Sequence, residues 1–176
     1  MKIGFCGTMS VGKTTLVKAL KELPEFKDYT FSTERSKYLR DLGIPLNTDS
    51  TIKGQIVFLA ERASELMCEN IITDRTILDV IAFTTLAKSI PYFIADEFTE
   101  LASHILKEYD YIFYISPEGI ELEDNGIRTI DSKYRIEIDN QIKKNIIQLS
   151  SKIRSLHHIA GTTEERIEKI KQVLSL

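Results

Sequence analysis

A short glycine-rich segment near the N-terminus constrains the fold of this chain more than any other part of its sequence. The pattern Gly-x-x-x-x-Gly-Lys-Ser/Thr is matched at every fixed position by Gly7-Thr8-Met9-Ser10-Val11-Gly12-Lys13-Thr14. This segment follows an apolar run of strand length, residues 2–6, and precedes a helical stretch. In that context the glycines let the backbone turn so that its N–H groups point at phosphate oxygens, and the helix adds the positive end of its dipole. The sequence therefore predicts a strand, a phosphate loop (residues 7–14) and a helix, in that order.

The residues of the phosphate loop have separate chemical tasks. Lys13 is expected to reach the β and γ phosphates, Thr14 to offer its hydroxyl to Mg²⁺, and Thr15 to lie near the α phosphate. The alternative is an incidental glycine-rich turn, but with glycine at about 7% of residues a chance match in this chain is on the order of one percent or less. We therefore expect a nucleotide bound by Gly7, Thr8, Ser10, Val11, Gly12, Lys13, Thr14 and Thr15.

Length and composition are those of one folded domain, which we expect to span residues 1–176. With 43% apolar residues the chain can bury its own core. Its net charge of −3 disfavours a protein that coats nucleic acid regardless of sequence. Cys6 and Cys68 have no partner at metal-ligand spacing and suit a reducing compartment. No apolar run is as long as a signal sequence or a membrane span, so we expect a cytoplasmic protein without a membrane partner, whose oligomeric state stays open.

Five short apolar runs alternate with longer amphipathic ones. The short runs have strand length, and three of them carry adjacent β-branched or aromatic residues, as buried parallel strands do. They cover residues 2–6, 29–32, 70–73, 110–115 and 156–160. This alternation predicts an α/β fold, a parallel sheet with helices on both faces.

The longer runs have the period of helices, because their apolar residues recur at spacings of three and four. One set consists of Ile52, Ile56, Leu59, Ala63 and Leu66, and a second of Tyr134, Ile138, Ile142, Ile146, Leu149 and Ile153. Thr162 and Glu165 have the spacing of a capping box at the start of a last helix.

Charged residues follow the second and third strands, at the sheet edge where such folds bind ligands. Glu34 is placed to act as a general base for an acceptor hydroxyl, or it is an ordinary residue of a first helical turn. Asp74 is placed to hold Mg²⁺ and Arg75 to brace a phosphate, or Asp74 caps the next helix. Gln55 and Arg62 are candidates for reading a base edge or a phosphate, or they belong to a polar helix face.

A segment of about residues 117–135 has the composition of a lid. It is acidic, lacks apolar periodicity, and carries Arg128 and Arg135. Arginines on such a segment can close over a triphosphate and stabilise charge on the transferred group. The alternative is a solvated loop whose arginines pair with nearby acidic residues.

These motifs together resemble the P-loop kinase group that includes the nicotinamide riboside kinase domain of the bifunctional NAD-synthesis regulator. The similarity rests on the phosphate loop, on Glu34 and Asp74-Arg75, and on residues 109–117 followed by Asp124-Asn125-Gly126-Ile127-Arg128. More distantly, the chain is similar to deoxynucleoside and nucleoside monophosphate kinases. The resemblance implies a five-stranded parallel sheet, ATP and Mg²⁺ as cofactors, and a lid with catalytic arginines.

We therefore expect a kinase that transfers the γ-phosphoryl group of ATP to a nucleoside, a nucleotide or a nicotinamide riboside-like acceptor. Either Glu34 or Asp74 would accept the acceptor's proton. Relatives carry Glu-x-x-Arg after the second strand, whereas Lys37 stands here at the Arg position, and we expect Arg35 to replace it. The expected catalytic residues are Lys13, Glu34, Asp74 and Arg128. Arg128 and Arg135 would also bind ATP, and Thr14 and Asp74 would hold the metal. The acceptor would be bound by Glu34, Arg35, Gln55, Arg62, Asp74 and Arg75.

Two alternatives stay open. The acceptor could be a hydroxyl of a modified base in DNA or a polynucleotide end, which would need a basic rim from Lys37, Arg40, Lys53 and Arg62. The chain could also be an ATP-binding regulatory module without an acceptor.

Overall fold

The computed structural model describes residues 1–33, 35–118 and 132–176. Five strands form one sheet in the order β2-β3-β1-β4-β5, and every neighbouring pair is parallel. They are β1 (Lys2–Cys6), β2 (Thr30–Ser32), β3 (Ile71–Asp74), β4 (Tyr111–Ile115) and β5 (Leu156–Ile159). The five expected strands are confirmed, each to within one residue at either end.

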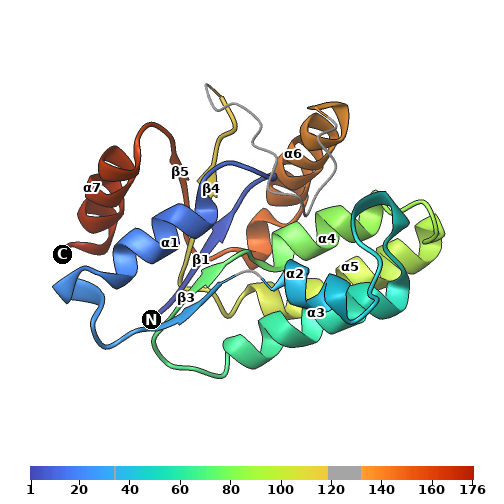
Figure 1. The fold of residues 1–176 in the computed structure, drawn as a ribbon, viewed down its shortest axis with the longest axis horizontal. Helices are drawn as coiled ribbons and strands as arrows, with labels where there is room; N and C mark the ends of the chain where they lie inside the picture. Colours follow the sequence, from blue (N-terminus) through green and yellow to red (C-terminus); the bar gives the residue numbers. More distant parts are fainter. Residues whose placement is uncertain (34, 119–131) are drawn as a thin grey trace.

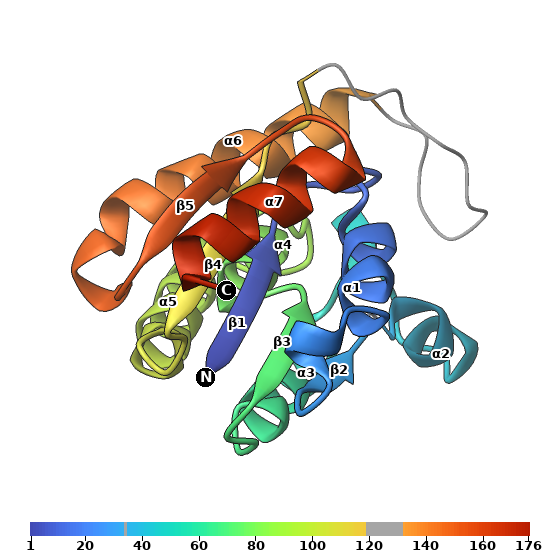
Figure 2. The same ribbon diagram turned by 90° about the vertical axis from the view of Figure 1, so that its left-hand side faces the viewer.

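Helices cover both faces of the sheet, as predicted (Figure 1). They are α1 (Lys13–Lys21), α2 (Ser36–Asp41), α3 (Ile52–Glu65), α4 (Ile77–Thr85), α5 (Tyr92–Leu106), α6 (Ser132–Gln148) and α7 (Thr163–Leu174), with short 3-10 turns η1 (Pro24–Phe26), η2 (Asn47–Asp49) and η3 (Ser150–Lys152). Figure 2 shows α1 and α7 on one side of β1, where they share a core cluster with the strands. On the other side, α3, α4, α5 and α6 form the larger cluster. Within the described residues, no helix combines the length and apolarity that crossing a bilayer requires.

The predicted apolar face is confirmed for α6 and partly wrong for α3, and the predicted start of α7 is confirmed. Four of the expected α6 residues are buried in the core, and the capping box of Thr162 and Glu165 is present. In α3, however, Ile56 is 53% exposed, whereas Gln55 and Arg62 are buried. The reason is that α3 turns a polar part of its surface inward, and this part includes Gln55 and Arg62.

Close packing between β1 and the start of α4 fixes the region where the site lies. A Cβ atom on Gly4 would lie 2.5 Å from the methyl group of Thr76 and 2.7 Å from the Tyr109 ring. Only glycine leaves room for these contacts. The register pairs Phe5 with Asp74, so the residues after β1 and after β3 meet at one edge of the sheet.

Candidate active site

The phosphate loop connects β1 to α1 with a backbone that needs glycine. Gly7 has φ +148° and Gly12 has φ +82°, and Ser10 also has a positive φ of +55°. A Cβ on Gly7 would lie 2.8 Å from the carbonyl oxygen of Ile115. The loop is therefore held tightly against the end of β4, and alanine does not fit at position 7.

Lys13 lies inside the loop rather than in solvent. Its side chain is buried, and its ammonium donates to the carbonyl oxygens of Gly7 and Thr8, at 2.7 Å each. The helix that it begins has no capping side chain and no acidic residue in its first turn. An uncapped helix N-terminus beside a buried ammonium is an arrangement that attracts anions.

Thr14 and Asp74 meet at the ends of α1 and β3. The Thr14 hydroxyl donates a short hydrogen bond to Oδ2 of Asp74, whose side chain is almost completely buried. The other carboxylate oxygen, Oδ1, is buried and has no hydrogen-bond partner among the described residues. A hydroxyl and a partly unsatisfied carboxylate are hard oxygen ligands of the kind that Mg²⁺ prefers.

The alternative interpretation of Asp74 as a helix cap is wrong, because Thr76 caps α4. The Thr76 hydroxyl accepts from the N–H of Leu78, and Asp79 completes a capping box by accepting from the N–H of Thr76 at 2.9 Å. Sequence reasoning did not single out Asp79, although the spacing Thr76-x-x-Asp79 is the signal that could have found its capping role. The second oxygen of Asp79, Oδ1, accepts from the N–H of Gly7 at 3.3 Å and lies 3.4 Å from a guanidinium nitrogen of Arg75.

Arg75 has a strained backbone and a buried side chain. Its φ of +111° is unusual for a residue with a side chain. The conformation is held by its N–H, which donates to the carbonyl oxygen of Phe5 at 3.1 Å, and by its carbonyl oxygen, which accepts from the Thr73 hydroxyl at 2.8 Å. The guanidinium lies over the ring of Phe83, 5.1 Å from its centre. Backbone strain of this kind is concentrated at functional sites in proteins.

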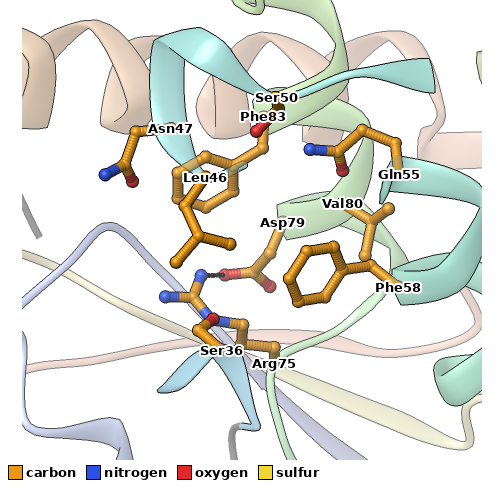
Figure 3. A pocket seen from close by; sticks show the side chains of 10 residues that line it. All are labelled: Ser36, Leu46, Asn47, Ser50, Gln55, Phe58, Arg75, Asp79, Val80 and Phe83. Carbon is orange, nitrogen blue, oxygen red and sulfur yellow. Dashed lines mark hydrogen bonds and ion pairs between the residues drawn. The ribbon is translucent and has the colours of Figure 1, made fainter. Parts of the chain in front are cut away.

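A pocket that is partly open to solvent lies beside Arg75 and Asp79. Figure 3 shows the side chains that line it, with the ion pair between Arg75 and Asp79 in its wall. They come from α2, the η2 region, α3, the connection after β3, and α4: Ser36, Leu46, Asn47, Ser50, Gln55, Phe58, Arg75, Asp79, Val80 and Phe83. Of the residues expected to bind an acceptor, the structure thus brings Gln55 and Arg75 together. The apolar members Phe58 and Phe83 were missed, because their periodicity is also that of core residues.

Arg62 and Arg35 do not line this pocket. Arg62 is buried, donates to Glu65 at 2.6 Å and reaches the backbone oxygen of Asp74 at 3.4 Å. Burial raises the pKa of the Glu65 carboxyl, against the opposing effect of the Arg62 charge. Arg35 is exposed and pairs with Glu61 at 3.3 Å.

Two arginines from later helices bond to carbonyl oxygens of the phosphate loop. Arg135, at the start of α6, donates to Met9 at 3.1 Å and to Ser10 at 3.4 Å. Arg166, in α7, donates to Val11 at 2.8 Å and was missed in the sequence, because nothing in its neighbourhood points to a residue so distant along the chain.

Other predicted residues of the site take simpler positions or are not described. Thr15 is exposed on the first turn of α1. Glu34, Arg128 and most of the predicted lid at residues 117–135 lie outside the described residues.

The chain is similar to known proteins both in sequence and in structure. The family model described as "AAA domain" matches residues 2–166. A search of curated proteins found no match.

Solved structures with the same fold include three that cover 99% of this chain. Deoxyadenosine kinase from M. mycoides, solved with the products dCMP and dCDP, is 18% identical, with a TM-score of 0.62 and 98% of its own chain covered. The NadR protein in complex with NR is 16% identical with a TM-score of 0.75, and this chain spans about half of it, 51%. YorR from Bacillus subtilis, in complex with phosphorylated GDP, is 18% identical with a TM-score of 0.61 and 95% of its chain covered. At these identities the likeness shows the fold.

Proposed function

This chain belongs to the AAA domain family, and from that premise we propose that it is an ATP- and Mg²⁺-dependent kinase with a nucleoside-like acceptor. One observation carries the proposal: the phosphate loop and the pocket share a wall. Asp79 lines the pocket and also accepts from Gly7 of the loop. A phosphoryl donor in the loop and an acceptor in the pocket would therefore be neighbours, and positioning of this kind supplies much of the rate in phosphoryl transfer.

On the donor side, the loop supplies amides, one buried ammonium and a helix N-terminus. Lys13 would exchange its contacts with the Gly7 and Thr8 carbonyl oxygens for the β and γ phosphates. Arg135 already reaches two carbonyl oxygens of the loop and would lie close to the bound nucleotide.

The residues present fit a Mg²⁺ ion. Thr14 and Asp74 would hold it, and the unsatisfied Oδ1 of Asp74 is the atom that such an ion or its water would satisfy. When bound, the ion would neutralise charge on the phosphates. Because Asp74 is engaged with Thr14, we assign the role of proton acceptor to Glu34.

On the acceptor side, the pocket favours a molecule without a phosphate group. Among the described residues that line it, Arg75 and Asp79 are the charged ones, and they pair with each other. A phosphate dianion would need a cation whose charge is not already balanced. The remaining lining combines the aromatic rings of Phe58 and Phe83 with the amide of Gln55. Flat apolar faces with a few hydrogen-bonding groups suit a nucleoside.

The structure gives little support to an acceptor in DNA. Of the four residues that would form the basic rim, Arg62 is 3% exposed and engaged with Glu65. Arg40 pairs with Asp41, which reduces its attraction for a phosphate backbone.

An acceptor panel tests the proposal. The protein is incubated with Mg²⁺ and ATP labelled at the γ position, together with deoxynucleosides, ribonucleosides, nicotinamide riboside, the corresponding monophosphates or duplex DNA. We expect labelled product from at least one nucleoside and none from DNA. Label released only as inorganic phosphate with every acceptor would refute a kinase, and phosphorylation of monophosphates alone would refute the acceptor class.

A variant of the pocket, compared with a matched control, then tests whether this pocket binds the acceptor. Gln55→Leu is expected to raise the acceptor KM at least about tenfold, because a buried amide that binds the acceptor is lost, and to leave the KM for ATP unchanged. Gln148→Leu makes the same exchange at an exposed position of α6 and is expected to change neither constant. An equal rise in both KM values for Gln55→Leu would contradict the assignment.

A further inference from the structure

Asp79 does more than the capping of α4 requires. Its side chain is almost completely buried, and its two oxygens face different partners. Oδ2 accepts from the N–H and the hydroxyl of Thr76, at 2.9 and 3.0 Å, and this alone completes the capping box. Oδ1 is turned toward Gly7 of the phosphate loop and Arg75 of the pocket, at 3.3 and 3.4 Å.

The capping box of α7 shows what capping alone looks like. There Glu165 accepts from the N–H of Thr162 at 2.8 Å in an exposed position. An exposed carboxylate stays hydrated, whereas a buried one loses its water and must recover the lost interaction from protein donors. Capping of α4 therefore does not by itself explain why Asp79 is buried. The donors that face Oδ1 explain it, because they replace the water that the buried carboxylate has lost.

Both groups that face Oδ1 are held in unusual conformations. Gly7 has φ +148° and no room for a side chain, and Arg75 has φ +111° with its guanidinium over Phe83. The separation of 3.4 Å between Arg75 and Asp79 is longer than the usual 2.7–2.9 Å of a charge-assisted hydrogen bond. The contact between the guanidinium and this carboxylate oxygen is therefore a weak one.

We propose that Asp79 is a positioning residue that couples the phosphate loop to the acceptor pocket through Gly7 and Arg75. The assignment of the two ends to ATP and acceptor rests on the proposed function. When a molecule fills the pocket and the Arg75 guanidinium moves, the positive charge next to Oδ1 of Asp79 moves with it. The electrostatic attraction between Oδ1 and the Gly7 N–H then changes. Binding free energies are reciprocal, so a phosphate bound in the loop changes the affinity of the pocket by the same factor by which a molecule in the pocket changes the affinity of the loop for phosphate.

The amide signal of Gly7 in ¹⁵N NMR spectra tests the coupling without any ligand. Four proteins are compared: wild type, Arg75→Gln, Asp79→Asn and the double variant. We expect Arg75→Gln to shift the Gly7 signal when Asp79 is present and to add no further shift in the Asp79→Asn background. Shifts that add in the double variant would overturn the proposal.

Two further variants separate positioning from stability. Glu165→Gln removes the carboxylate from the other capping box and is expected to leave the Gly7 signal unchanged. If Asp79→Asn does not fold, Phe83→Leu decides the question, because it removes the ring beneath the guanidinium and keeps Asp79. A Gly7 signal that does not move in Phe83→Leu contradicts the coupling.

Calorimetry with Mg²⁺ and the non-hydrolysable analogue AMP-PNP extends the test to the nucleotide. Asp79→Asn is expected to weaken binding about fivefold or more, and Arg75→Gln to alter the affinity only when Asp79 is present. If wild type binds no AMP-PNP while the NMR coupling is seen, the proposed function fails and the positioning role stands. If wild type binds the analogue but the effects of the two substitutions are additive, the positioning role alone fails.

Discussion

Replacing Lys13 with methionine gives the sharpest prediction for the phosphate loop. The substitution keeps an unbranched side chain in the buried position and removes the ammonium with its two 2.7 Å hydrogen bonds. Hydrogen bonds to charged groups contribute about 1.5–3 kcal/mol each, but the lost ammonium also no longer has to be desolvated. We expect a net destabilisation of about 2 kcal/mol, which lowers the Tm of a chain of this size by roughly 4–8 °C.

The effect on turnover is expected to be much larger than the effect on stability. An ammonium that meets the charge developing on the transferred group is worth about 10³-fold in kcat, or about 4 kcal/mol. The assay is phosphoryl transfer from labelled ATP to the best acceptor of the panel, at a temperature where Lys13→Met is folded. Lys18→Met, at an exposed position of the same helix, is the control and is expected to keep wild-type turnover. A fall in kcat of less than about tenfold for Lys13→Met would refute the role assigned to the ammonium.

Two further predictions concern the loop backbone and the buried ion pair. Gly7→Ala is expected to destabilise the protein by more than about 2 kcal/mol in urea unfolding, because its Cβ would lie 2.8 Å from the Ile115 oxygen in addition to the strain of a positive φ. Gly43→Ala also has a positive φ, +85°, but open space around it, so it should lose only about 1 kcal/mol, and equal losses would show that the contact with Ile115 does not matter. Burial raises the pKa of Glu65, so the folded state binds that proton more tightly than the unfolded state. The stability of wild type relative to Glu65→Gln should therefore fall as the pH rises from the ordinary glutamate pKa through the raised one. Urea unfolding at several pH values measures this difference, and a rise over the same range would mean that the Arg62 ion pair outweighs burial.

Features that depend on neighbouring residues could be predicted from the sequence. The phosphate loop is identified by eight consecutive residues, and the five strands by short apolar runs between turns. The capping box of Thr162 and Glu165 was also predicted, because its two members are three residues apart. In each case the physical cause is local.

Features that depend on distant packing could not be predicted. Asp79 contacts Gly7 across 72 positions, and the pattern around it shows only the cap. Gln55 and Arg62 were both expected to bind an acceptor, but periodicity locates only the apolar face of a helix, so the sequence could not show that Gln55 lines a pocket and that Arg62 forms a buried ion pair. The pocket itself combines side chains from α2, α3 and α4, and its shape follows from their packing.

Because Arg166 donates a hydrogen bond to Val11, the phosphate loop depends on a part of the chain that is synthesised much later than the loop itself. A carbonyl oxygen of the N-terminal loop receives its donor from a residue 155 positions later, and α7 packs on α1 in the same core cluster. On the ribosome, the first strand and its loop emerge long before this helix does. A nascent chain that ends before α7 therefore carries a loop without one of its supports, and we expect such a chain to hold nucleotide less well than the finished one.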